Sequence, residues 1–152
     1  MRIMAVDYGD ARTGVAVSDV SAALVGDAWV VRQAGRDKLA NLIAAEARSR
    51  EVGVVVVGYP KNMDGSIGPR AEKSDQFAAL LREKLAEQEQ AEQGDGSSVP
   101  PITVVLWDER LTTMSADRIL AEAGKFGKKR KNTIDAVAAS LILESYLRSC
   151  AK

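Results

Sequence analysis

Three acidic residues carry the chemistry that this sequence suggests. Asp7 ends an apolar run that predicts a strand, Glu109 ends a second such run, and Asp135 lies near the start of a predicted helix. Ligand sites in α/β sheets gather beyond the carboxyl ends of central strands. Clustered carboxylates repel unless a cation neutralises them, and oxygen ligands suit Mg²⁺ or Mn²⁺. The three acids therefore predict a divalent-metal site that hydrolyses phosphodiester bonds.

Each acid taken alone has a structural alternative. Asp7 could start an Asx turn in a hairpin. Glu109 could be a solvated partner of a neighbouring arginine, and Asp135 could be favoured by the dipole of its helix. Their combined placement at the ends of elements is what favours a shared site.

The residues that are missing exclude several other chemistries. The chain has no histidine and a single cysteine, Cys150. Neither a Ser-His-Asp nor a Cys-His arrangement can form, and a structural zinc site or an internal disulfide is excluded too. A bound metal ion would activate water in place of a histidine base.

Length and charge point to one soluble domain. The 152 residues, 46% of them hydrophobic, are enough for a single domain spanning residues 1–152. The apolar run at residues 3–6 is too short for a signal peptide, and no stretch is long enough for a membrane span, so we expect a cytoplasmic protein. Lys and Arg together number 21, as do Asp and Glu, which leaves room only for a local basic patch.

The hydrophobic pattern predicts the elements that position the acids. Apolar and β-branched runs predict strands at residues 1–7, 14–18, 28–32, 52–58 and 102–107. Helical spacing predicts helices over 37–50, around 77–85, over 115–123, and finally after a cap at Asn132 or Thr133. The polar stretch 87–101 predicts a flexible surface loop at about 88–101. This order predicts an α/β fold with a mixed five-stranded sheet and helices on both faces.

Basic residues near the acids are candidates for binding nucleic acid. Five of them form a dense run just before Asp135, namely Lys125, Lys128, Lys129, Arg130 and Lys131. A solvated loop is the alternative explanation, but the neighbouring acid favours phosphate binding. Arg12 and Arg110 could contact the scissile or a neighbouring phosphate, although Arg12 could also be a plain turn residue.

Four segments resemble, in order, the motifs of one known family. They are DYGDARTGVAVSD at residues 7–19, GYPKNMDG at 58–65 with GPRAE at 68–72, DERLTT at 108–113, and IDAVAA at 134–139. They resemble the YqgF (RuvX-like) family, the pre-16S rRNA nucleases, which are also described as Holliday-junction-resolvase-like proteins. The resemblance implies a ribonuclease H-like fold, a bacterial cytoplasmic setting, and a role in maturing the 5′ end of 16S rRNA with the acidic triad Asp7, Glu109 and Asp135. Precursor rRNA, branched DNA and pre-ribosomal particles are the partners that it allows.

Three rival functions stay open at this point. A resolvase of four-way DNA junctions would use the same acids but usually needs a dimer, and the sequence leaves monomer and homodimer equally open. An ATP-binding regulator of the actin-like class shares the Asp-x-Gly opening, but it needs a second phosphate-binding hairpin and normally a second domain. A non-catalytic nucleic-acid-binding protein would be favoured only if one acid were missing.

Overall fold

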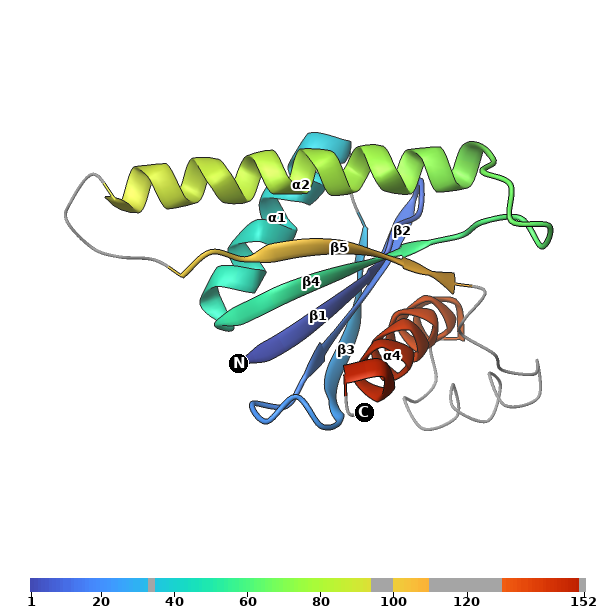
Figure 1. Cartoon of the computed structure of the whole chain (residues 1–152), viewed down its shortest axis with the longest axis horizontal. Coiled ribbons are helices and arrows are strands. Elements are labelled where there is room, and N and C mark those ends of the chain that lie inside the picture. Colours follow the sequence, from blue (N-terminus) through green and yellow to red (C-terminus); the bar gives the residue numbers. More distant parts are fainter. Residues whose placement is uncertain (33–34, 94–99, 110–129, 151–152) are drawn as a thin grey trace.

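The computed structural model describes residues 1–32, 35–93, 100–109 and 130–150 (Figure 1), and the statements below concern these ranges. The elements are β1 (Arg2–Asp7), β2 (Arg12–Ser18), β3 (Val25–Arg32), α1 (Arg36–Ser49), β4 (Val52–Tyr59), α2 (Pro69–Gln93), β5 (Thr103–Asp108) and α4 (Arg130–Cys150). The helix predicted over 115–123 lies outside the described residues.

The five strands form one mixed sheet in the order β3-β2-β1-β4-β5. The short turn after β1 joins it to β2 as an antiparallel hairpin, and β3 pairs antiparallel with β2. Strands β4 and β5 each follow a helix, α1 or α2, and therefore run parallel to β1 and to each other. The predicted mixed five-stranded sheet is confirmed.

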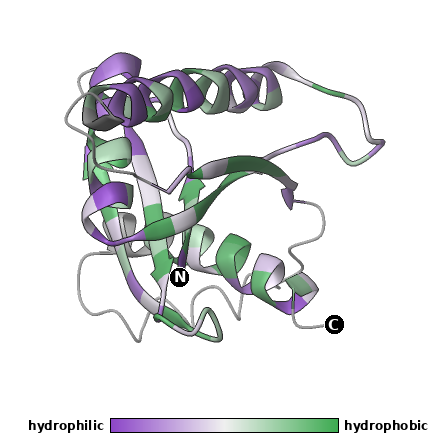
Figure 2. Cartoon of the chain, turned by 60° about the vertical axis from the view of Figure 1, so that its left-hand side comes forward, coloured by the Kyte–Doolittle hydropathy of each residue, from purple (hydrophilic) through white to green (hydrophobic). Residues whose placement is uncertain are grey.

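Alternate side chains of each strand enter opposite core layers, because a strand has a period of two. Met4, Val6 and Val57 pack with α1 and α2 on one face of the sheet. Ile3 and Ala5 pack with α4 on the other face, so helices cover both faces as predicted (Figure 1). Figure 2 shows hydrophobic residues along the strands and along α4, and a mixture of hydrophilic and hydrophobic residues along α1 and α2. Among the described helices, none is long and apolar enough to cross a membrane.

Helix α2 corrects the loop predicted at 88–101. The helix continues to Gln93, so residues 88–93 are helical, while 94–99 lie outside the described residues. Glu, Gln and Ala are strong helix formers. The polar composition of residues 88–93 was therefore a poor indicator of a loop. Arg48 of α1 also holds this part of the helix, with its guanidinium 3.1 Å from Glu89 and 3.4 Å from Gln88.

Helix α4 corrects a second prediction. It begins at Arg130, so Asn132 and Thr133 lie inside it and neither is its cap. Asp135 is therefore in the second turn, and no acid stands in the first. Arg and Lys are better helix formers than Asn and Thr, and burial of the following residues against the sheet stabilises the whole helix.

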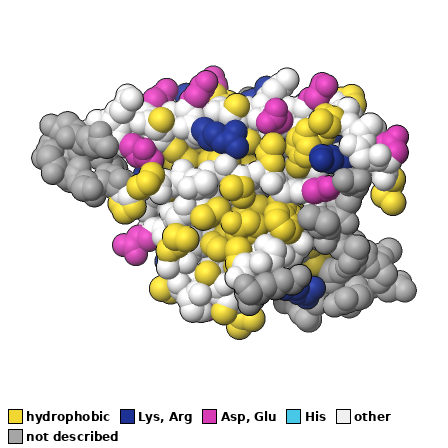
Figure 3. Space-filling view, viewed as in Figure 1, with side chains coloured by type: hydrophobic (Ala, Val, Ile, Leu, Met, Phe, Trp, Pro, Cys, Tyr) yellow, Lys and Arg dark blue, Asp and Glu magenta, His cyan; other side chains and the backbone are white. Residues whose placement is uncertain are grey.

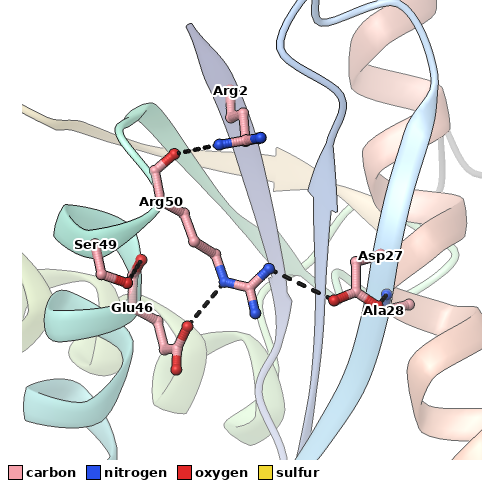
Figure 4. Close-up of polar contacts among 6 residues, drawn as sticks. All are labelled: Arg2, Asp27, Ala28, Glu46, Ser49 and Arg50. Carbon is pink, nitrogen blue, oxygen red and sulfur yellow. Dashed lines mark hydrogen bonds and ion pairs between the residues drawn. The ribbon is translucent and has the colours of Figure 1, made fainter.

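The edge strand β3 is fixed to α1 by Arg50 (Figure 4). The Arg50 guanidinium lies 4.2 Å from the centre of the Trp29 ring, and it bonds to Glu46 at 2.8 Å and to Asp27 at 3.5 Å. Arg2 of β1 donates to the Arg50 carbonyl at 3.0 Å. These contacts connect α1, β1 and β3 at the end of the sheet where β1 begins.

Strand β5 is the opposite edge of the sheet. Figure 3, which has the same view as Figure 1, shows hydrophobic side chains gathered in the middle of the face toward the viewer. Trp107 of β5 is half-buried, its indole donates to the Ser145 hydroxyl at 3.0 Å, and its ring meets Tyr146 edge-on. The Arg82 guanidinium donates to the Val104 carbonyl at 3.0 Å, so this backbone acceptor of the edge strand has a hydrogen-bond partner.

Candidate active site

Asp7 ends β1 on the face of the sheet that α4 covers. Ile3 and Ala5 contact α4, so the strand's alternation places Asp7 on the same face. Asp7 pairs with Gly14 of β2 across the hairpin. In Figure 1 the carboxyl ends of β1, β4 and β5, the start of α2 and the start of α4 lie at one end of the molecule.

Glu109 comes directly after β5 and lies across Gly58 of β4. A Cβ atom on Gly58 would be 2.6 Å from Glu109 Oε1, 3.1 Å from its Cδ and 2.7 Å from Ile142 Cδ1. Two of these distances are shorter than real Cβ contacts, so any side chain at position 58 would force Glu109 or Ile142 to shift. Gly58 is also the next residue after Val57, which pairs with Val6, and thus lies beside Asp7.

The two carboxyl groups of Asp7 and Glu109 meet above this glycine. Burial raises the pKa of Glu109, and the neighbouring charge of Asp108 adds to that rise. A hydrogen bond with Asp7 and the positive charge of Arg70 oppose it and lower the pKa. Two carboxylates this close repel when both are charged, and a bound cation would remove that repulsion.

The hairpin turn next to Asp7 is held by α2 and by its own side chains. The Tyr8 ring stacks on Phe77, with their centres 4.7 Å apart. Asp10 accepts from Lys73 of α2 at 3.2 Å. The Gly9 amide donates to the buried Thr13 hydroxyl at 3.3 Å. These contacts fix the end of β1 and with it the position of Asp7.

Asp135 belongs to the same end of the molecule by its place in α4. Its side chain lies outside the described residues, but its backbone is helical and stands one turn before Ala139, which packs against the sheet. Among the described side chains, no group of three acids, cysteines or histidines is close enough to hold a metal ion. The structure therefore brings Asp7 and Glu109 together and leaves the third acid as a prediction.

The structure describes the predicted basic residues unevenly. Arg12 begins β2 and is half-buried. Arg110, Lys125, Lys128 and Lys129 lie outside the described residues. Arg130 and Lys131 form the start of α4, and their side chains are not described.

Two residues of the site were not predicted from the sequence. Arg70, in the first turn of α2, is exposed and its charge acts on Glu109. Gly58 follows an uninterrupted run of valines. A glycine at the carboxyl end of a buried strand signals close approach by another group, and this signal could have identified it.

The donors present fit a divalent cation. Asp7 and Glu109 offer carboxylate oxygens only, which hard cations prefer, and the space above Gly58 keeps both groups close. Burial penalises the charged form of Glu109 in the absence of a cation. A positive ion would remove that penalty.

Replacing Gly58 with alanine tests this arrangement. We expect Gly58→Ala to lower the free energy of unfolding by about 1–3 kcal/mol, because the new methyl group overlaps Glu109 and Ile142. Urea unfolding measures this loss of stability. The single variant Glu109→Ala and the double variant Gly58→Ala with Glu109→Ala complete a double-mutant cycle. The cost of Gly58→Ala should be clearly smaller in the Glu109→Ala background; equal costs would mean that Glu109 does not occupy this space.

The pH dependence of stability tests the environment of Glu109. Its raised pKa means that the folded, metal-free protein holds more protons than the unfolded chain just above the ordinary value of 4.5, so stability falls as pH rises through that window. Glutamine at position 109 does not titrate, so Glu109→Gln does not lose stability in this way. In EDTA, its free energy of unfolding should exceed that of the unchanged protein by an amount that grows from pH 4 to about pH 7. Urea unfolding across pH measures it, with the exposed Glu83→Gln as control. An advantage independent of pH would contradict a desolvated carboxyl group.

Two solved structures with the same architecture are titled as complexes with Holliday junctions. Thermus thermophilus RuvC in complex with a Holliday junction substrate aligns over 99% of this chain and 96% of its own, with a TM-score of 0.58 and 16% identity. The Fowlpox virus resolvase bound to Holliday junction DNA aligns over 100% of both chains, with a TM-score of 0.56 and 16% identity. At such identities the likeness establishes the ribonuclease H-like fold and nothing finer.

Sequence relatives are much nearer. A protein of Halothermothrix orenii is 43% identical over 97% of this chain and 94% of its own, and one of Caldanaerobacter subterraneus is 41% identical over 98% and 97%. Both carry the name "Putative pre-16S rRNA nuclease". The family model described as "RuvX: Holliday junction resolvase" matches residues 1–149. This chain belongs to the RuvX family.

Proposed function

We propose that the chain is a metal-dependent nuclease of the cytoplasm that trims the 5′ end of precursor 16S rRNA, acting as a single domain over residues 1–152. The observation that carries the proposal is the contact between Asp7 and Glu109 above Gly58. The names of the sequence relatives, at 38–43% identity over nearly the whole chain, supply the substrate. Family membership and fold both agree with an enzyme that hydrolyses phosphodiester bonds.

Asp7, Glu109 and Asp135 are the residues that would hold the metal. Mg²⁺ or Mn²⁺ bound by carboxylates supplies charge stabilisation for the attacking and leaving oxygens and lowers the pKa of a bound water. The hairpin that carries Asp7 is packed against α2 through Tyr8 and Phe77, and the glycine at position 58 leaves room for the Glu109 carboxyl group. Arg70 adds positive charge beside Glu109, where the negative charge of a phosphate would gather.

The remaining basic residues of the prediction extend this site toward the substrate. In the proposal, Arg12 and Arg110 contact phosphates next to the cleaved bond. Lys125, Lys128, Lys129, Arg130 and Lys131 bind the backbone further along. Their sequence position before and at the start of α4 agrees with this role.

A four-way DNA junction is the second candidate substrate, because the family model carries the resolvase description. The same acids would cut it, and two copies would be required for symmetric cleavage. Pre-ribosomal particles would be partners only for the rRNA function. Precursor rRNA and junction DNA offered in the same assay separate the two candidates.

The direct test is cleavage of a precursor 16S rRNA leader by the purified protein with Mg²⁺, Mn²⁺ or EDTA. We expect cutting only with metal, and a fall of roughly 100-fold or more in Asp7→Asn and in Glu109→Gln, because each variant removes charge from the reacting centre. Glu83→Gln is the control, since Glu83 is an exposed acid of α2 outside the site, and it should keep most activity.

Several outcomes would change this conclusion. Cutting that persists in EDTA or in both site variants would contradict the proposed site. Metal-dependent cutting of the junction with none of the rRNA leader would establish the resolvase function instead.

A further inference from the structure

Two arginines face each other on the two strands beyond Asp7. Arg12 at the start of β2 pairs directly with Arg32 at the end of β3. The pairs that continue this row are Gly14 with Val30 and Ala16 with Ala28. Ala16 and Ala28 belong to the core layer of α4, so Arg12 and Arg32 lie on the face that carries Asp7.

The arginine pair and the acidic pair lie at the same end of the same face of the sheet. The pair level with Asp7 is Gly14 with Val30, and Arg12 with Arg32 lies two residues further along the same two strands. On the other side of β1, Gly58 of β4 is followed across the sheet by Trp107, and Glu109 comes two residues later. Neighbouring strands are roughly 4.8 Å apart, so Arg32 stands about two strand spacings, ~10 Å, from the line of β1.

Like charges directly opposite on a sheet are unfavourable, which makes an arginine pair an unusual choice for structure alone. Arginine forks match the oxygens of phosphate groups, and two of them side by side can hold consecutive phosphates. Arg12 is half-buried and Arg32 is exposed, so the pair reaches solvent at this end of the sheet. Both residues also interact within the chain, and a phosphate would join those contacts.

We propose that Arg32 and Arg12 form a phosphate-binding track that holds the nucleic-acid backbone on the β3 side of the acidic pair. Arg32 contributes to substrate binding and does not touch the reacting atoms. The ligand is a phosphodiester backbone, RNA or DNA. The position of the cleaved bond relative to the track rests on the proposed function, whereas binding by the track does not.

The first test measures binding without cleavage. A labelled RNA strand from the precursor leader and a four-way DNA junction are titrated in EDTA at several KCl concentrations, with fluorescence anisotropy as the readout. We expect Arg32→Ala and Arg12→Ala each to weaken binding roughly tenfold, since a hydrogen bond to a charged group contributes about that much. Each should also reduce the salt slope by about 0.7 on single strands, while Arg32→Lys keeps the slope.

The control is Arg148→Ala. Arg148 is an exposed arginine in the last turn of α4, 4.0 Å from Glu144. The Arg148→Ala variant should bind the RNA strand and the junction as tightly as the unchanged protein does. Urea unfolding of each variant shows whether the fold survives. If Arg32→Ala does not fold, Arg32→Gln replaces it, because glutamine removes the charge and keeps part of the side-chain length.

Cleavage kinetics separate binding from chemistry. Arg32→Ala should raise KM roughly tenfold and leave kcat nearly unchanged, because the lost contact is made equally in the ground and transition states. The proposed track would be overturned if Arg32→Ala left the affinity and the salt slope unchanged. It would also be overturned if Arg148→Ala weakened binding as much as Arg32→Ala. Binding that depends on Arg32 in a protein that cuts no substrate would support the track and overturn the proposed nuclease function.

Discussion

The structure depends on keeping two carboxyl groups together in a partly buried place. Asp7 and Glu109 meet above Gly58, and burial disfavours the charge of Glu109. A side chain at position 58 would displace Glu109 or Ile142, so the close approach of Glu109 depends on this glycine. Without a metal ion, folding therefore places the charged form of Glu109 in an unfavourable environment, and a divalent cation would relieve this cost. An ordinary surface ion pair carries no such cost, because its charges stay in water.

The surrounding elements serve this contact in distinct ways. The order β1, β4, β5 at the centre and edge of the sheet brings an acid, a glycine and a second acid side by side. Stacking of Tyr8 on Phe77 ties the end of β1 to α2, whose first turn supplies Arg70. Far from the site, Arg50 holds β3 to α1, and the other end of β3 carries Arg32.

Much of the fold and part of the site could be predicted from the sequence. Runs of β-branched residues fixed the strands to within a few residues, and the acids at strand ends predicted the meeting of Asp7 with Glu109. The end of α2 and the start of α4 were misplaced, because polarity and capping residues are local signals that helix propensity and tertiary packing override. Gly58 and Arg32 were missed since their roles come from register between strands, which a single sequence does not state.

The most direct measurement is a crystal structure grown with Mn²⁺ and examined by anomalous diffraction. A manganese peak within roughly 2.0–2.3 Å of oxygens from both Asp7 and Glu109, with Asp135 as a further ligand, is the predicted result. A peak bound elsewhere, or no peak at millimolar Mn²⁺ while the two carboxyl groups remain in contact, would contradict the account.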